Sequence, residues 1–340
     1  MKITNLQNCI QNVTGILPGL VPVLFIAAVA SWFGNVIPIL GGPIAAILIG
    51  LAAGEIFGQR PAWEGGLQFS SKTILQASIV LLGAGMSLAE VARIGIDGLP
   101  VMVGTLVICI VAGIVIGRAM QIEYDTRVLI TYGTAICGAS AIAIMSVVIG
   151  ATGPAIAISV TVIVAYNVLA AIIFPAVGHM LGLSQEAFGM WAGTAVNDTS
   201  SVVAAAAVYG SVAAGYAVVV KLTRTLALVP LAVFQSWFQN RDSLEEKRQE
   251  TVWYRLIPPF LVLFLVAVII QSAGLIPEAW SGPIRFLAYF GITAAMAAIG
   301  MRSSLSTIRS AGWKPLAFGG VLWILVAVSS LVLQWLTGQL

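Results

Sequence analysis

The sequence predicts an all-α polytopic membrane protein, and three observations lead to that fold class. Of the 340 residues, 59% are hydrophobic and only 9% are charged, whereas soluble domains carry about 25% charged residues. Apolar runs of about 20 residues, the length that crosses about 30 Å of hydrocarbon as a helix, recur along the whole chain. Short turns rich in Gly and Pro separate many of these runs.

Eleven apolar runs are long enough to be transmembrane helices, and together they predict one membrane transport domain over residues 1–340. Residues 1–14 come before them, with apolar positions at roughly helical spacing, and are predicted to lie along the membrane interface; a frayed tail is the alternative. The polar segment 239–252 is predicted to be a cytoplasmic linker between two halves. The predicted spans are residues 15–33, 37–58, 70–90, 98–118, 128–149, 154–177, 187–207, 213–237, 254–273, 282–302 and 314–337.

The basic residues predict the orientation of the chain, because short cytoplasmic loops carry an excess of Lys and Arg. Loops after odd-numbered spans hold only Arg93 and Arg285. We therefore expect a cytoplasmic N-terminus and, with an odd number of spans, a periplasmic C-terminus. Loops after spans 2, 4, 8 and 10 hold Arg60, Lys72, Arg118, Arg127, Arg241, Lys247, Arg248, Arg255, Arg302, Arg309 and Lys314.

Several function classes are disfavoured by what the chain contains. Three cysteines without CxxC spacing and a single histidine, His179, make a metal site of Cys and His an unfavoured interpretation. No phosphate-binding GxxxxGK[ST] stretch is present, which argues against ATP-driven transport by this chain alone. We expect no cofactor, no nucleic-acid partner and no enzymatic activity. A scaffold or sensor is disfavoured because no sizeable soluble region offers a surface to a partner.

Two similar segments predict an inverted-topology repeat, an arrangement that underlies many secondary transporters. Residues 83–95 read GAGMSLAEVARIG and residues 300–312 read GMRSSLSTIRSAG. Both fit G-x-x-x-S-L-x-x-[VI]-x-x-x-G, and an apolar span follows each copy. The copies end spans 3 and 10, so an odd number of spans separates them and they face opposite sides of the membrane. Chance similarity between helix ends is the alternative.

Two short polar stretches lie within apolar spans, GTAICGASAI at 133–142 and GTAVNDTS at 193–200. Mid-helix glycines allow a helix to break, and a break leaves backbone N–H groups without partners. The N-terminal end of a half-helix carries partial positive charge and can bind an anion. Small residues also permit close helix crossing, which is the simpler interpretation. The candidate ligands of the first stretch are Gly133, Thr134, Cys137, Gly138 and Ser140.

Charged residues on adjacent spans complete the candidate site. Span 7 places four polar residues at i, i+3, i+4 and i+7, which is one face of a continuous helix. Charges at mid-bilayer are costly, so these side chains are expected to face the protein interior. Asp198 alone cannot neutralise two cations, so the local sum of +1 favours an anionic ligand; a simple ionic staple between the spans is the alternative. The residues are Thr194, Asn197, Asp198 and Ser201 on span 7, and Lys221 and Arg224 on span 8.

These motifs, together with KLTR at 221–224 and GMRSSL…AGWKPL near the end, resemble the YeiH-like sulfate exporter family of bacterial inner-membrane proteins. The resemblance implies the cation:proton antiporter and anion transporter superfamily, with a panel, a core and crossed, broken helices. It also implies that 133–142 belongs to the crossover helix of the first repeat. The family often has His where this chain has Asn197, so a coupling role for that His does not carry over.

The leading hypothesis is a secondary transporter that exports a sulfate-like or sulfonate-like anion across the cytoplasmic membrane by alternating access. H⁺ or Na⁺ is the expected coupling ion, the lipid bilayer is the other partner, and a homodimer is left open. The alternative is a cation antiporter in which Asp198 binds Na⁺ or H⁺ and the basic pair adjusts its ionisation.

Overall fold

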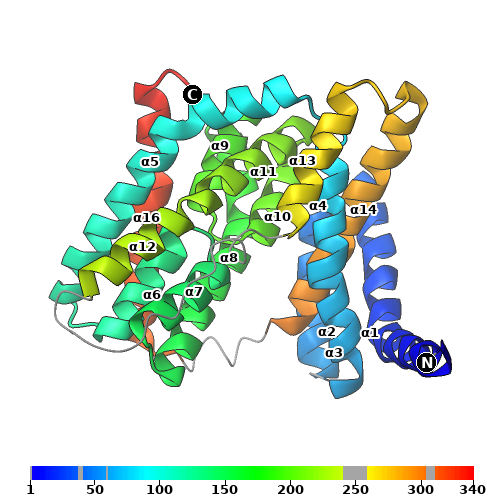
Figure 1. The fold of residues 1–340 in the computed structure, drawn as a ribbon, viewed down its shortest axis with the longest axis horizontal. Coiled ribbons are helices and arrows are strands. Elements are labelled where there is room, and N and C mark those ends of the chain that lie inside the picture. Colours follow the sequence, from blue (N-terminus) through cyan, green and yellow to red (C-terminus); the bar gives the residue numbers. More distant parts are fainter. Residues whose placement is uncertain (1, 37–40, 59, 240–258, 304–310) are drawn as a thin grey trace. The chain divides into compact units, whose positions relative to one another are not determined.

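The computed structural model describes residues 2–36, 41–58, 60–239, 259–303 and 311–340. Within these ranges every regular element is a helix (Figure 1), which confirms the predicted all-helical class. Among the described residues, six helices are long and apolar enough to cross a membrane, so the count of about eleven stays a prediction. These six are Gly15–Gly34, Leu88–Ala119, Gly153–Met180, Ser211–Gln235, Glu278–Arg302 and Trp313–Leu336.

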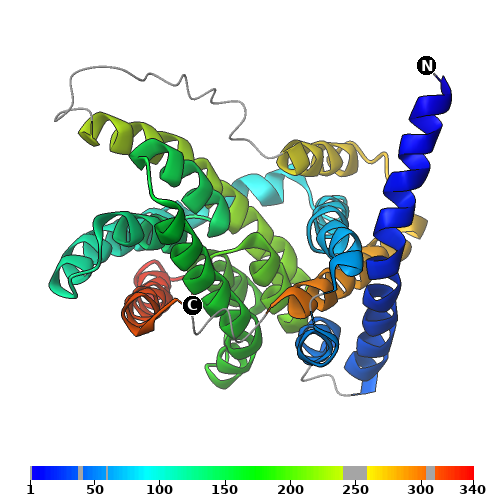
Figure 2. The same cartoon turned by 90° about the horizontal axis from the view of Figure 1, so that it is seen from below.

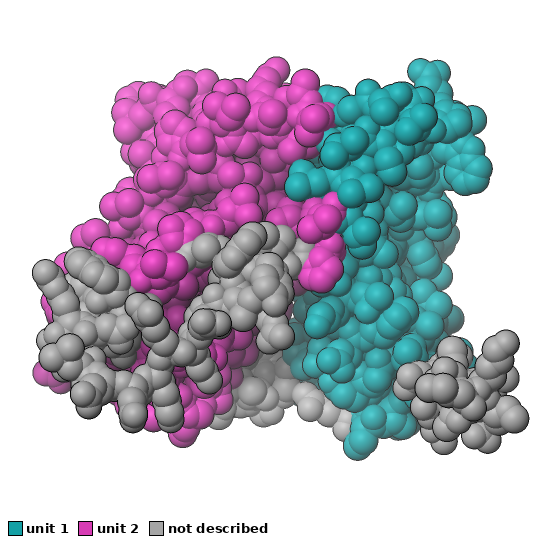
Figure 3. All heavy atoms as spheres, in the orientation of Figure 1, with its two compact units in different colours: residues 1–87, 263–305 teal, residues 88–262, 306–340 magenta. Residues whose placement is uncertain are grey.

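The chain forms two compact units, coloured separately in Figure 3. Unit 1 consists of Met1–Ser87 and Leu263–Leu305, and unit 2 consists of Leu88–Val262 and Ser306–Leu340. Most of the predicted linker 239–252 lies outside the described residues, as does the centre of the second repeat copy, 304–310. The linker and the sequence repeat therefore stay predictions.

Unit 1 is built on close packing of α2 (Gly41–Phe57) against α14 (Glu278–Arg302). A Cβ placed on Gly50 would lie 2.4 Å from the carbonyl oxygen of Ala297, and one on Gly300 would lie 2.4 Å from that of Ile47. Small residues are what allow helix backbones to approach this closely. Glycines on both helices therefore determine this contact.

The other helices of unit 1 include one that is longer than predicted. α1 (Lys2–Val36), the dark blue helix of Figure 2, is continuous through the predicted interfacial segment 1–14 and through the first span. The helical run that contains most of the third predicted span, 70–90, begins earlier than predicted, with α3 (Pro61–Gln68). It continues through a π-helix, η1 (Phe69–Ile74), into α4 (Leu75–Gly83) and ends there, before the predicted boundary. α13 (Pro259–Ser272) follows later in the chain.

Unit 2 has a frame of long helices. α5 (Leu88–Ala119) packs against α16 (Trp313–Leu336). α16 also packs against α8 (Gly153–Met180), and α5 packs against the short helix that follows it in the chain. A buried apolar cluster that includes Val162, Phe318 and Leu322 joins α8 to α16. The frame is completed by α11 (Ser211–Leu226) and α12 (Leu228–Gln239).

The predicted span 128–149 is not one helix but a hairpin of α6 (Tyr124–Ala135) and α7 (Ala139–Ile149). At its base, the backbone N–H of Thr152 donates to Oδ2 of Asp125 at 3.0 Å. Near its tip, a Cβ on Gly133 would lie 3.1 Å from Cγ1 of Ile142, whereas nine residues of continuous helix span about 13 Å. The chain therefore returns to the end from which it entered.

The predicted span 187–207 is also a hairpin, formed by α9 (Gln185–Ala195) and α10 (Thr199–Tyr209). The ring of Phe188 near the start of α9 stacks on Tyr209 at the end of α10, with 3.8 Å between the ring centroids. The backbone N–H of Val212 donates to Oε1 of Gln185 at 3.0 Å. Both arms of this second hairpin therefore open at the same end.

The two hairpins enter unit 2 from opposite ends of α8. This helix starts beside the base of the first hairpin, and near its other end His179 stacks on Tyr209 at the base of the second. At about 1.5 Å per residue, its 28 residues span about 42 Å. The hairpin tips meet between these ends, because a Cβ on Gly138 would lie 3.6 Å from Cα of Asp198.

Candidate functional site

The tip of the first hairpin is a turn that depends on glycine. α6 ends at Ala135, and Gly138 before α7 has φ 69° and ψ −128°. L-residues with a side chain rarely adopt this conformation, whereas glycine adopts it without steric cost. Gly138 is therefore the break that the sequence predicted. Gly133, also predicted at the break, lies instead within α6, where it lets Ile142 and Ile163 approach.

The tip of the second hairpin is held by side chains. Oδ1 of Asn167 on α8 accepts hydrogen bonds from the backbone N–H groups of Asn197 at 3.1 Å and Asp198 at 3.2 Å. The carboxylate of Asp198 caps the start of α10, accepting from the backbone N–H of Ser200 at 3.1 Å and from its hydroxyl. A carboxylate at this position is favoured both as a cap and by the helix dipole.

Lys221 on α11 joins the two tips. Its side chain is fully buried, and Nζ donates to the carbonyl oxygens of Ile136 at 2.9 Å and Val196 at 2.8 Å. These residues follow the last residues of α6 and α9, so the ammonium lies at two helix C-terminal ends, where a cation is stabilised. Lys221 is thus a shared cap. Among the described residues, no ion pair of 4.0 Å or less joins it to Asp198, so the predicted ionic staple is absent there.

Arg224 lies one turn further along α11, and its guanidinium differs from the Lys221 ammonium in its contacts. Its side chain is 2% exposed, and within the described part of the chain Nε, Nη1 and Nη2 all lack a hydrogen-bond partner. It interacts electrostatically with the thiols of Cys109 and Cys137. A buried charge without a partner is expensive. The guanidinium is therefore, among the described groups of unit 2, the one that most clearly requires a ligand.

Two other side chains at the tips have polar atoms without partners. The hydroxyl of Thr134 and both amide atoms of Asn197 are buried and make no hydrogen bond among the residues that the structure describes. Nearly all buried polar groups in folded proteins are hydrogen-bonded. With Arg224, these groups place unused donors on both hairpins and on α11.

The other predicted site residues have different surroundings. Thr194 is on α9, and its hydroxyl donates to the carbonyl oxygen of Met190 at 2.7 Å and shares a 2.6 Å hydrogen bond with Ser330 on α16. Ser140 is exposed in the first turn of α7, and Ser201 is buried in α10. The predicted stripe on one helix face is wrong, because the helix breaks between Thr194 and Asp198.

Sequence reasoning missed Ser330 as a neighbour of the second hairpin. Ser330 accepts a hydrogen bond from Nε2 of Gln334 at 3.2 Å, so two polar residues of α16 form a chain that ends at Thr194. Ser330 and Gln334 are polar residues in an apolar run and lie i, i+4 on α16. That spacing could have indicated a polar face turned toward other helices.

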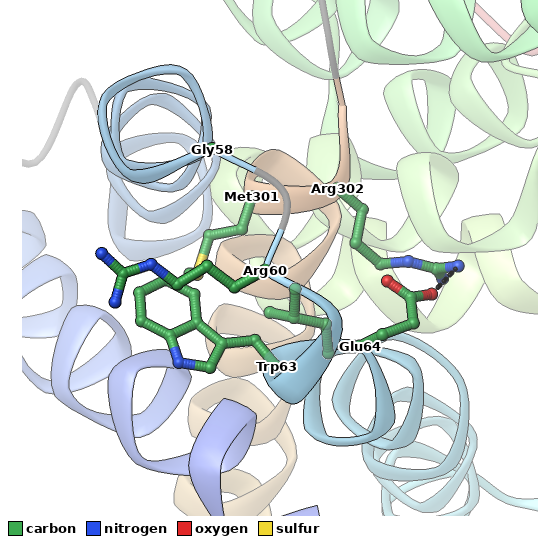
Figure 4. A pocket seen from close by; sticks show the side chains of 8 residues that line it. Gly58, Arg60, Trp63, Glu64, Met301 and Arg302 are labelled. Atoms are coloured by element: carbon green, nitrogen blue, oxygen red, sulfur yellow. Dashed lines mark hydrogen bonds and ion pairs between the residues drawn. The ribbon is translucent and has the colours of Figure 1, made fainter.

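A cavity of about 310 Å³ in unit 1 provides a contrast (Figure 4). Nη2 of Arg302 donates to Oε1 of Glu64 at 2.8 Å, and the Arg60 guanidinium lies 5.0 Å from the centre of the Trp63 ring. The side chains of Arg302 and Glu64 are 41% and 54% exposed. This surface pair is already neutralised, so the cavity does not require a charged ligand.

Comparison with known proteins places the chain in a family. The family model described as Conserved hypothetical protein 698 matches residues 18–319. The UPF0324 membrane protein of Streptococcus agalactiae serotype V is 36% identical over 331 residues, which are 95% of this chain and 98% of that protein. The UPF0324 membrane protein of Streptococcus mutans serotype c is 36% identical over 334 residues, 95% of this chain and 97% of its own.

These matches confirm the resemblance seen in the sequence motifs, since they cover nearly the whole chain at 36% identity. The matched region contains both hairpins and α11. The chain belongs to the UPF0324 family of membrane proteins.

Proposed function

We propose that this protein is a secondary transporter that exports a small anion across the bacterial cytoplasmic membrane by alternating access. The observation that carries the proposal is the buried guanidinium of Arg224, whose three nitrogens have no partner among the described residues. Discontinuous helices whose ends meet near an ion site are typical of secondary transporters. Unit 2 contains two such discontinuities, one in each hairpin.

The residues divide into ligands and supports. Arg224 provides charge and directional donors to the anion, and the free polar atoms of Thr134 and Asn197 complete its coordination. Lys221, which the sequence also predicts as an anion ligand, is assigned a supporting role in this proposal, because its ammonium donates to the carbonyl oxygens at two helix ends. The tips are reachable from the surface of unit 2, because Ser140 is exposed and Asp198 is half-buried.

The proposed orientation places the base of the first hairpin in the cytoplasm. Arg118 in the last turn of α5 and Arg127 in α6 lie at that end, as the positive-inside rule requires. Nε2 of Gln339 donates to the carbonyl oxygen of Asp97 at 2.6 Å, which places the C-terminus at the other end of α5. The opposed hairpins also support an inverted arrangement within unit 2.

Flux measurements on the purified chain in proteoliposomes test the proposal. Labelled sulfate and a labelled sulfonate are loaded, and efflux is followed with and without a pH or Na⁺ gradient. Arg224→Gln should abolish anion flux, because the amide cannot supply the buried positive charge. Arg93→Gln is the matched control, since the Arg93 side chain is 73% exposed and pairs only with Asp97 at 3.7 Å among the described residues. Equal flux through both variants contradicts the proposal.

A Na⁺ or H⁺ antiporter with Asp198 as the ion site is the second candidate. It is favoured by the position of Asp198, a half-buried residue, where the two hairpin tips meet. In that case Asp198→Asn abolishes flux driven by a cation gradient, and Arg224→Gln does not abolish cation exchange in the absence of any transported anion.

A further inference from the structure

We propose that the site at the hairpin tips selects a monovalent oxyanion over a divalent one. This inference rests on the proposed function and concerns the charge that the site can accept. It follows from comparing each ionised side chain at the tips with the helix ends that face it. A helix end carries about half an elementary charge, positive at the N-terminus and negative at the C-terminus.

The charge of Lys221 is already balanced. Its ammonium donates to the carbonyl oxygens of Ile136 and Val196, at the C-terminal ends of α6 and α9. Two ends of about −0.5 sum to about −1. Lys221 and these two ends are therefore close to neutral as a group, and Lys221 has little charge left for a ligand.

The charge of Asp198 is balanced in the opposite sense. Its carboxylate caps the N-terminus of α10 through the backbone N–H of Ser200. The N-terminus of α7 is the second positive end, because its cap residue Gly138 packs against the backbone of Asn197 and Asp198. Two ends of about +0.5 offset one carboxylate.

Arg224 is then the one unbalanced charge among the described groups at the tips. The titratable groups near it are Lys221, treated above, and the buried thiols of Cys109 and Cys137, which carry no charge when protonated and so do not offset it. A monoanion brings this buried region to neutrality. A dianion leaves a net charge of −1 in a place screened from water, which costs free energy unless a second cation follows it.

The free donors indicate an anion with several oxygens. A guanidinium presents its N–H groups as a planar fork that suits two oxygen atoms of an oxyanion. The Thr134 hydroxyl and the Asn197 amide nitrogen add further donors with no partner among the described residues. The site therefore matches the chemistry of a compact oxyanion of charge −1, such as a sulfonate or the monovalent form of phosphate.

Binding of perchlorate and sulfate to the purified full chain tests this, because both probes are tetrahedral but differ in charge. The wild type should bind perchlorate more tightly. Asp198→Asn raises the local charge by one unit and should shift the ratio of the two dissociation constants toward sulfate. A shift of about tenfold is expected for a charge about 10 Å away at an effective dielectric constant of about 20. Hydration differs between the probes but not between the proteins, so it cancels in this shift.

Asp125→Asn is the matched control, since Asp125 makes a comparable backbone contact at the base of the first hairpin, and it should leave the ratio unchanged. Tighter sulfate binding by the wild type, or an unchanged ratio in folded Asp198→Asn, overturns charge selection. If the wild type binds neither perchlorate nor sulfate, the result contradicts the proposed function instead.

A measurement on the wild type alone keeps the inference testable if Asp198→Asn does not fold. Phosphate changes from a monoanion to a dianion as the pH rises through neutrality, whereas perchlorate stays a monoanion. The apparent affinity for total phosphate should fall over that range while the affinity for perchlorate stays constant. An affinity for phosphate that is constant or rises overturns the proposal.

Discussion

The two hairpins of unit 2 have the same architecture but make their turns by different means. The first relies on the backbone of Gly138, with φ 69° and no side-chain cap on α7. The second has an extended backbone at Val196 and depends on Asn167 and Asp198 for its hydrogen bonds. A turn made by glycine requires space and a special conformation, whereas a turn made by side chains requires particular partners. Lys221 donates a hydrogen bond to each turn and so connects the two.

Replacing the shared residue should have the largest effect on stability. Lys221→Met keeps the length of the side chain but leaves the C-terminal ends of α6 and α9 without their cation. A hydrogen bond to a charged group contributes about 1.5–3 kcal/mol, so the loss of two such bonds should cost about 3–6 kcal/mol. Thermal unfolding in detergent should show a large decrease, and hydrogen exchange should rise at both tips. Lys72→Met, at an exposed position in η1, is the control; an equal effect of the two variants would contradict the role of Lys221.

Asn167→Ala should weaken the second tip alone. The substitution removes the acceptor of two backbone N–H groups, those of Asn197 and Asp198. A buried donor left without a partner costs about 1–3 kcal/mol. The contact to Asp198 is only part-buried, so the loss for the pair is expected at the lower end of the combined range, about 2–3 kcal/mol. Hydrogen exchange should increase at residues 197–198 and not at 137–138. Increased exchange at both tips would mean that the two turns are not independent.

Gly138→Ala should weaken the first tip by a smaller amount. A backbone held in a rarely populated region costs about 1–3 kcal/mol, and the nearest atom to an added Cβ, Cγ2 of Ile163 at 3.3 Å, adds modest crowding. The unfolding temperature should fall in Gly138→Ala. It should be unchanged in Gly153→Ala, where nothing lies within 4 Å of the added atom. An unchanged unfolding temperature in Gly138→Ala would show that the fold does not require the positive φ at this position.

Glu64→Gln should have the smallest effect and tests whether burial, not charge alone, makes the tips sensitive. The pair of Glu64 with Arg302 is exposed, and exposed ion pairs contribute about 0–1 kcal/mol. The unfolding temperature should change little, and the change should become smaller in high salt. A loss as large as that of Lys221→Met would make the contrast between buried and exposed charges invalid.

Much of the fold could be predicted from the sequence, because long apolar runs and mid-span glycines have few structural interpretations. The reversal of chain direction at each break could not be predicted. A run such as 128–149 has the length of one membrane span, and the same run also suits two short arms. Periodicity within each arm does not record the direction taken after Gly138. The stripe from Thr194 to Ser201 failed for this reason, since helical spacing has no meaning across a turn.

The candidate site was predicted in part for a related reason. Asp198, Lys221 and Arg224 were identified because charges in apolar spans are rare. The different bonding of Lys221 and Arg224 could not be identified from the sequence, because Lys221 donates to backbone carbonyl oxygens. Every residue has such oxygens, so the sequence does not mark those of Ile136 and Val196. The sequence likewise does not indicate that Asn167 accepts from backbone N–H groups, because nearly every residue has one.

The shared cap of Lys221 also determines the order in which the membrane core can be completed during synthesis. Ile136 and Val196 precede Lys221 by 85 and 25 residues. The carbonyl groups that end α6 and α9 therefore lack their partner until α11 has entered the bilayer. Arms of 11 or 12 residues are too short to span the hydrocarbon alone. The first hairpin therefore reaches its final set of contacts only after Lys221, which is translated 85 residues later than Ile136, has been added.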